Sequence, residues 1–300
     1  METPENGSPS SLRKEENTTG NSNTEAEEAS CSSEPVETKE KVVEKGEEKL
    51  SLITWNVDGL DGEQQPERAR GLCSCLSKYS PDVVLLQEVV QPYVRFLHNR
   101  LAADYTFIEG GKLGYFTGMM LKQSRVTLLR SKIIPYQTSH MMRNLLVAQV
   151  VFKGQELWLM TSHLESCKNN AEERMKQLRW VMKMMSKAPD NVTVLFGGDT
   201  NLRDAEVAQV GLPSCVCDVW EQLNQPEHCR FTWDTVANTN KDMRFKSRFR
   251  FDRVYLRRAT KDGVPWLEPE SMALVGLEKL KCGRYTSDHW GIHCMFSLSK

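Results

Sequence analysis

The sequence predicts an α/β fold built as a layered sandwich, with mixed sheets inside and helices outside. Apolar stretches typical of buried strands alternate with helical patterns from Ser51 almost to the end of the 300-residue chain. Between two of these stretches, Lys153, Gly154 and Gln155 form a pattern typical of a hairpin turn. We therefore expect at least part of the sheet structure to be antiparallel.

Ten strands and three clear helices are expected. The strands are Leu52–Val57, Val83–Gln87, Tyr105–Glu109, Phe116–Lys122, Asn144–Phe152, Glu156–His163, Val192–Gly198, Phe251–Leu256, Met272–Leu277 and Gly291–Leu298. The helices are Pro66–Lys78, Pro92–Leu101 and Ala171–Lys187, with weaker helical patterns near Ala205 and Val219. Apolar residues recur on one face of the third helix, so we expect that face to pack against a sheet.

The near-neutral net charge of −1 hides two unlike parts. Residues 1–50 contain thirteen Glu and six basic residues but no aromatic residue, whereas residues 51–300 contain 33 basic and 27 acidic residues and all 24 aromatics. A segment with so few apolar side chains cannot offset the entropy of ordering. We therefore predict an acidic disordered tail over 1–50 and a single catalytic domain over 51–300.

The composition also excludes some classes of protein. No run approaches the ~20 apolar residues of a membrane span, and the N-terminus lacks the pattern of a signal peptide. The nine cysteines are odd in number and scattered, which is typical of a reducing compartment. We expect a soluble intracellular protein that does not bind membranes.

Polar residues follow four of the predicted strands where a purely structural strand would not need them. These residues lie in four stretches, Asn56-Val57-Asp58-Gly59, Gln87-Glu88, Gly198-Asp199-Thr200-Asn201 and Ser287-Asp288-His289. Each stretch alone is compatible with an ordinary turn. Together, at strand ends of an α/β fold, they supply the complementary groups of an active site.

The residue types suit metal-assisted hydrolysis of a phosphodiester. Glu88 and Asp58 offer the carboxylate oxygens that a hard divalent cation requires. Asp199 can accept a proton from water, and Asn56, Asn201 and His289 can donate hydrogen bonds to a charged centre.

These four motifs, in this order, resemble the endonuclease/exonuclease/phosphatase superfamily of Mg²⁺-dependent phosphoesterases. The resemblance implies a four-layer α/β sandwich of two mixed, largely antiparallel sheets flanked by helices. Further stretches resemble one branch of the superfamily over essentially all of residues 51–298. They are Thr54–Asp61, Met141–Leu146, Met160–Ser166, Gly198–Asp204, Phe231–Thr235 and Gly276–Leu280.

That branch hydrolyses the bond between a DNA 5′ phosphate and the tyrosine of a trapped type II topoisomerase. The resemblance implies Mg²⁺, with Mn²⁺ as a possible substitute, held directly by Glu88 and, through waters, by Asp58. It implies Asp199 as the base that activates water, His289 as the donor to a phosphoryl oxygen and Asp288 as the group that orients His289. A buried structural role for Glu88 stays open.

The resemblance also implies a substrate-binding surface. His163, Ser166 and Arg203 are expected to bind phosphate, and Tyr115, Trp233 and Phe251 to line a channel for the DNA end. A core position stays open as the alternative for His163, and core packing is as typical as channel lining for Phe251. The other residues expected along this surface are Asn56, Val57, Asp58, Gly59, Leu60, Leu164, Glu165, Cys167, Lys168, Asn201 and Leu202.

Several alternatives remain at this stage. The substrate could be a protein-linked RNA 5′ end, the enzyme could be a general nuclease, and a signalling adaptor role could accompany catalysis. The basic stretch Arg244, Lys246, Arg248, Arg250 and Arg253 either tracks a DNA backbone or is a solvated face. The substrate implies residence in the nucleus, with the cytoplasm also open, and we expect a monomer.

Overall fold

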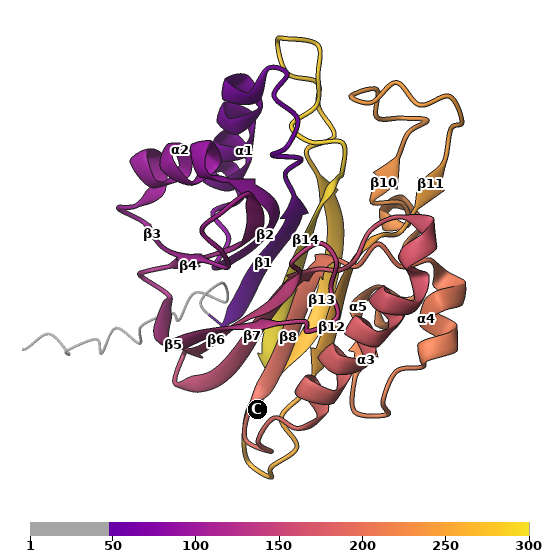
Figure 1. The fold of residues 1–300 in the computed structure, drawn as a ribbon. Helices are drawn as coiled ribbons and strands as arrows, with labels where there is room; N and C mark the ends of the chain where they lie inside the picture. The colour runs from indigo at the N-terminus through magenta and orange to yellow at the C-terminus, as the bar shows by residue number, and fades with distance from the viewer. Residues whose placement is uncertain (1–47, 300) are drawn as a thin grey trace, which may run out of the picture. The chain divides into compact units, whose positions relative to one another are not determined.

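Two six-stranded sheets face each other in a computed structural model that describes residues 48–299 (Figure 1). Sheet 1 has the order β13-β14-β1-β2-β4-β3, formed by Trp266–Val275, Gly291–Ser299, Lys49–Asn56, Val83–Val90, Tyr115–Lys122 and Tyr105–Glu109. Sheet 2 has the order β5-β6-β7-β8-β12-β9, formed by Val126–Pro135, Asn144–Phe152, Gln155–His163, Thr193–Asp199, Asp252–Arg257 and Cys217–Asp218. A short ribbon pairs β10, Trp233–Asp234, with β11, Arg248–Phe249.

Helices cover the outer face of each sheet, so the four layers are confirmed (Figure 1). Helices α1, Gln65–Tyr79, and α2, Gln91–Leu101, pack on sheet 1. Helices α3, Ala171–Ser186, and α4, Asp204–Val210, pack on sheet 2, and α5, Val219–Gln222, is a single turn beside β12. The apolar face predicted for α3 is buried there through Met175, Leu178, Val181, Met182 and Met185.

A third apolar cluster fills the space between the two sheets. It joins Leu52 and Leu85 of sheet 1 to Leu159 and Leu195 of sheet 2, and all four side chains are fully buried. A buried Leu stabilises a fold by roughly 1.5–3 kcal/mol relative to an exposed one. This inner layer therefore fixes one sheet against the other.

Each sheet contains one parallel pair of neighbours, β1 with β2 and β7 with β8, and its other pairs are antiparallel. The carboxyl ends of the strands in a parallel pair lie at the same edge. Asn56 and Gln87 are paired in sheet 1, and His163 and Asp199 are paired in sheet 2. The residues predicted from strand ends are thereby brought toward one edge.

Every predicted strand is present, but the sequence missed β5 and the two-residue strands β9, β10 and β11. The edge strand β5 is mostly exposed and its sequence, with Arg130 and Lys132 among its apolar residues, shows no clear alternation. The strand predicted at Met272–Leu277 spans Trp266–Val275 instead, and a register shift between Pro269 and Ser271 interrupts the alternation in its first part. The weak helical patterns near Ala205 and Val219 are α4 and α5.

The predicted tail lies outside the described residues except for its end. β1 begins at Lys49, and Leu50 is fully buried opposite Phe296. The folded region therefore includes at least two residues that were assigned to the tail. Among residues 48–299, no helix is long and apolar enough to cross a membrane.

Gly276 packs closely against Trp55, so a substitution at this glycine tests the packing. Gly276 has φ +81°, and an added Cβ would overlap the fully buried indole ring of Trp55. We expect Gly276→Ala to lower the free energy of unfolding by about 3 kcal/mol, because strain and overlap combine. The control Gly263→Ala has similar φ, +74°, but open space, so about 1 kcal/mol is expected there. Equal losses in urea unfolding would contradict the role of Trp55.

Candidate active site

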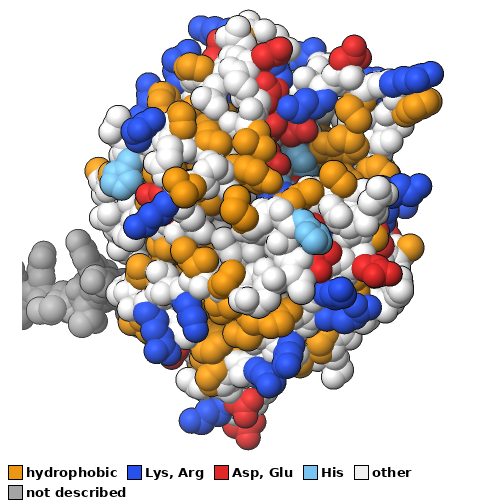
Figure 2. Space-filling model, viewed as in Figure 1, with side chains coloured by type: hydrophobic (Ala, Val, Ile, Leu, Met, Phe, Trp, Pro, Cys, Tyr) orange, Lys and Arg blue, Asp and Glu red, His pale blue; other side chains and the backbone are white. Residues whose placement is uncertain are grey.

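The candidate site lies where the parallel strand pairs of the two sheets end. Asn56 ends β1, Asp199 ends β8, and His289 is separated from the start of β14 at Gly291 by Trp290 alone. Figure 2 shows acidic side chains and a histidine gathered in a depression in the upper part of the view. Asn56, Asp199 and His289 are buried, with 2%, 1% and 7% of their surface exposed.

Glu88 is directed by a distortion in β2. The pairing of β2 with β4 shifts between Leu86 and Val89, and Glu88 itself has φ 54°. A bulge re-aims a side chain, and a left-handed conformation in a residue other than glycine costs about 1 kcal/mol or more. Burial raises the pKa of Glu88 to about 7, and repulsion from Asp199 contributes. This strain and charge are typical of a functional residue.

Asp199 is the centre of the site. Its Oδ2 accepts a hydrogen bond from Asn56 Nδ2 at 2.9 Å, and its Oδ1 accepts one from the backbone N–H of Asn201 at 2.9 Å. Oδ2 also lies 3.3 Å from His163 Nε2 and 3.7 Å from His289 Nε2. All four neighbours were predicted as site residues from the sequence. The structure places Asn56, Asn201, His163 and His289 around the one carboxylate.

His289 is oriented by a carboxylate that the sequence did not single out. Its Nδ1 lies 2.8 Å from Oδ2 of Asp252, the first residue of β12, which is paired with Asp199 across the sheet. The hydrogen bond predicted for Asp288 is therefore made by Asp252, whereas Asp288 accepts from Trp233 Nε1 at 3.2 Å. Burial lowers the pKa of His289, but Asp252 and Asp199 outweigh it and raise that pKa well above its ordinary value.

His163, unlike His289, is neutral. Arg143, which can only donate, lies with NH1 3.0 Å from Nδ1 of His163. The ring proton is therefore on Nε2, which faces Asp199. Burial lowers the pKa of His163 to about 3, and Arg143 contributes to this shift. The site thus pairs a neutral histidine with a charged one.

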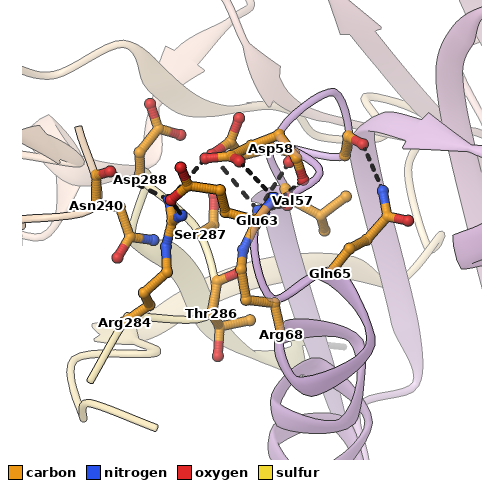
Figure 3. Close-up of polar contacts among 12 residues, drawn as sticks. Val57, Asp58, Glu63, Gln65, Arg68, Asn240, Arg284, Thr286, Ser287 and Asp288 are labelled. Carbon is orange, nitrogen blue, oxygen red and sulfur yellow. Dashed lines mark hydrogen bonds and ion pairs between the residues drawn. The ribbon is translucent and has the colours of Figure 1, made fainter. Parts of the chain in front are cut away.

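Arg68 of α1 holds the loop after β1 against the segment before β14. Its fully buried guanidinium donates to the carbonyl oxygens of Val57, Asp58, Asp61 and Thr286 at 2.7 to 3.0 Å (Figure 3). Buried charge is tolerated only when such partners satisfy it. The loops that carry Asp58 and His289 are therefore fixed to each other.

The donor set fits a hard divalent cation. Glu88 and Asp58 lie on adjoining segments, since the N–H of Gly59 donates to the Glu88 carbonyl oxygen at 3.1 Å, and repulsion from Asp288 and Asp58 adds to the raised pKa of Glu88. Burial raises the pKa of Asp58 to about 6, with repulsion from Asp288 adding to it. Such an excess of buried negative charge suits an ion with oxygen ligands.

A second group of ligand atoms is formed by Asp199, Asp252 and His289, which lie within 4.8 Å of one another. In this group Asp252 already holds His289 Nδ1. We therefore assign it to proton handling and keep Glu88 and Asp58 as the metal candidates.

Aromatic rings form a shelf beside the site. Phe249 stacks on Phe251 at 4.8 Å and on Trp233 at 6.1 Å, measured between ring centroids. Arg203 lies over Phe249 and Phe251 at 5.5 and 5.9 Å. Phe249 was not predicted, because an aromatic in a basic stretch gives no signal of its own. Tyr115 lies apart from this shelf, edge-on to His163 at 6.3 Å.

Several residues predicted to contact substrate have side chains that point elsewhere. Val57, Leu164 and Leu202 are fully buried in apolar clusters, so only their backbone groups could meet a ligand. Ser166 Oγ accepts from Arg143 NH2 at 3.2 Å. Asn201 Nδ2 donates to the carbonyl of Leu164 at 3.2 Å. Leu60, Cys167 and Lys168 are exposed, and Gly59 donates from its N–H to the Glu88 carbonyl.

The basic stretch does not form one DNA-facing surface. Arg250 is buried and paired with Asp218 at 2.7 Å, and Arg253 is buried and paired with Asp204 at 2.6 Å. Arg248 is paired with Asp234 at 2.9 Å. Of the five, Arg244 and Lys246 are exposed and form no ion pair with any residue between 48 and 299. Within this basic stretch, Arg244 and Lys246 are therefore the residues available to contact a DNA backbone.

Comparisons with known proteins agree with the fold and the site. The Endonuclease/Exonuclease/phosphatase family matches residues 53–289. The chain belongs to this family.

Within the family, the chain is similar to tyrosyl-DNA phosphodiesterase 2. It is 58% identical to that protein from Danio rerio over 91% of this chain and 75% of the relative, and 54% identical to the Gallus gallus protein over 83% and 67%. The crystal structure of D. rerio TDP2 complexed with single-strand DNA product matches with a TM-score of 0.80 at 60% identity, covering 83% of this chain and 99% of that one.

Glu165, predicted to contact substrate, makes its side-chain hydrogen bonds within the protein. Its carboxylate accepts from Ser139 Oγ, the His140 N–H and Gln177 Nε2 at 2.7 to 3.0 Å. Burial works to raise the pKa of Glu165, but these hydrogen bonds outweigh it and lower that pKa below the ordinary value of 4.5. The side chain therefore secures the loop that precedes Arg143.

We expect Glu165→Gln to lower the free energy of unfolding by about 1–3 kcal/mol at pH 7, because a charge-assisted set of hydrogen bonds is lost. The lowered pKa means that the contribution is present above the unfolded value of 4.5 and disappears as pH falls through the folded value. The difference from wild type in urea unfolding should therefore shrink below about pH 4. Exposed Glu172→Gln is the control, and a difference independent of pH would contradict the role.

Proposed function

We propose that this protein is a Mg²⁺-dependent phosphodiesterase that hydrolyses the bond between a DNA 5′ phosphate and a topoisomerase II tyrosine. One observation carries the proposal. A buried carboxylate, Asp199, is held by Asn56 and faces one neutral and one charged histidine, beside the strained Glu88, in a chain 58% identical to tyrosyl-DNA phosphodiesterase 2. The product is a 5′ phosphate that a ligase can join.

The residues divide the chemistry among them. Asp199 accepts the proton of the attacking water, and Asn56 keeps its carboxylate in position. His289, charged and oriented by Asp252, donates to a phosphoryl oxygen as negative charge develops there. A cation held by Glu88 and Asp58 would neutralise charge on the phosphate. Mg²⁺ is the proposed ion and Mn²⁺ a substitute, since both take oxygen ligands.

The leaving group explains why no strong general acid is required. A phenol has a pKa near ~10, about five units below that of an alcohol, so the tyrosine departs readily as a phenolate. What the site must supply is an oriented water and a held substrate. Trp233, Phe249 and Phe251 suit the second task, because bases of any sequence stack on aromatic rings.

The proposed substrate also bears on where the protein acts in the cell. We propose that the protein acts as a monomer in the nucleus, where trapped topoisomerase II occurs, without excluding the cytoplasm. Protein-linked RNA 5′ ends remain a second candidate substrate, since the proposed chemistry at phosphorus is the same. Rates on tyrosyl-DNA, tyrosyl-RNA and unmodified ends, measured in parallel, separate these substrates. If the protein also acts as a signalling adaptor, it would bind its partners through surfaces away from the active site.

The decisive assay follows conversion of a 5′-tyrosyl oligonucleotide to a 5′ phosphate. We expect activity with Mg²⁺ that is abolished by a chelator and restored by added Mg²⁺. Asp199→Asn should lower kcat by about a thousandfold or more, because an amide cannot accept the proton, while the unfolding midpoint changes little. Full activity of this folded variant would exclude Asp199 as the base.

A double-mutant cycle tests the pairing of His289 with Asp252. Asp252→Asn should lower kcat about a hundredfold or more with little change in KM, because the ring loses its orientation and charge. Combined with His289→Gln, it should add almost nothing to the loss from His289→Gln alone. Additive losses would show that Asp252 acts independently of His289.

A further inference from the structure

Lys241 places a positive charge directly on one of the proposed metal-binding carboxylates. Its Nζ lies 3.0 Å from Oδ1 and 2.8 Å from Oδ2 of Asp58, so both carboxylate oxygens are within hydrogen-bonding distance of one ammonium group. The Asp58 side chain is 7% exposed and that of Lys241 is 33% exposed. The lysine therefore approaches from the solvent side and covers the carboxylate.

The same ammonium group is tied to a second acid. Lys241 Nζ lies 2.9 Å from Oδ2 of Asp61, and that oxygen also accepts from Arg284 at 2.6 Å. Arg284 in turn donates to the backbone carbonyl of Asn240, beside Lys241 in the chain. Figure 3 shows Arg284 and Asn240 on the side of Asp58 opposite to Gln65. Lys241 can therefore leave Asp58 and stay attached through Asp61.

The lysine belongs to the segment that carries part of the aromatic shelf. Residues 233–249 run from Trp233 of β10 to Phe249 of β11 and include the exposed Phe245. Its paired ends are fixed by the ribbon, whereas Lys241 and Asn240 attach the intervening loop to the rest of the domain. A contact on Asp58 thus also positions this loop.

We propose that Lys241 is a tethered cation that neutralises Asp58 and competes with the divalent ion for it. The inference rests on the proposed metal site at Glu88 and Asp58. An ion that uses Asp58, directly or through its waters, requires the carboxylate oxygens that now face Lys241. Binding of the ion and attachment of the loop at Asp58 therefore oppose each other, and each weakens the other by the same factor.

The competition has a measurable size. A unit positive charge a few ångströms from a divalent ion is unfavourable even at an effective dielectric constant of about 20, so its removal should tighten ion binding about tenfold or more. The lysine in return neutralises the buried Asp58 carboxylate before the ion arrives, together with Arg68, whose NH2 lies 3.5 Å from Oδ2. Lys241 is thus a positioning residue for the metal site and for the loop, without contact to the reacting atoms.

The test is Mn²⁺ binding to the full chain without substrate, followed by the loss of free-ion signal in electron paramagnetic resonance. We expect Lys241→Met, which removes the charge and keeps the length, to lower the dissociation constant about tenfold. Lys241→Arg keeps the charge and should bind like wild type. Lys246→Met removes a charge from an exposed position in the same loop and should also bind like wild type.

A second measurement follows the loop itself. In wild type, Mn²⁺ should speed amide hydrogen exchange in residues 236–247, and in Lys241→Met that exchange should be fast with or without the ion. Unchanged or weaker Mn²⁺ binding by Lys241→Met would overturn the inference, as would equal tightening in Lys246→Met. Glu88→Gln separates the two proposals: if wild type binds no Mn²⁺, or if Glu88→Gln binds it unchanged, the metal site itself is wrong and the inference falls with it.

Discussion

The accumulation of negative charge at one edge of the sandwich is the constraint on which the other features of the site depend. Five carboxylates meet there, those of Asp58, Glu88, Asp199, Asp252 and Asp288. Burial makes each charge costly, and proximity adds repulsion. The charge is offset by His289 beside Asp199 and Asp252, and by Lys241 and Arg68 beside Asp58, while a bulge in β2 turns Glu88 into the site.

The two halves of this arrangement come from different sheets, so their spacing must be fixed. Gln87, fully buried next to Glu88, donates from Nε2 to Thr54 Oγ1 in its own sheet and to Thr161 Oγ1 in the other, at 3.2 and 3.0 Å. Gly197 lets the sheets approach closely, because an added Cβ would press on Leu85 and Thr54. The hydrogen bonds of Gln87 and the lack of a side chain at Gly197 thus set the distance between Glu88 and Asp199.

The sequence predicted the layers, the strands longer than two residues except β5, and the residues that gather around Asp199, because strand-end polar residues and apolar periodicity are local signals. It could not predict Asp252, since one Asp after Phe251 in a basic stretch looks like any surface charge. Only the antiparallel register that places Asp252 opposite Asp199 shows its role. Nor could the sequence predict the partners of Glu165, which follows His163 closely in sequence but turns its carboxylate toward α3 and the loop at 139–140.

The position of β14 has a consequence for how the domain is made. This strand lies between β13 and β1, so the first strand of sheet 1 has no neighbour on that side until the last strand has been synthesised. Sheet 2, with β5 to β12, can pair its strands while the chain is still on the ribosome. His289 is synthesised together with β14, after Asn56 and Asp199. Closure of sheet 1 by β14 therefore coincides with completion of the candidate active site.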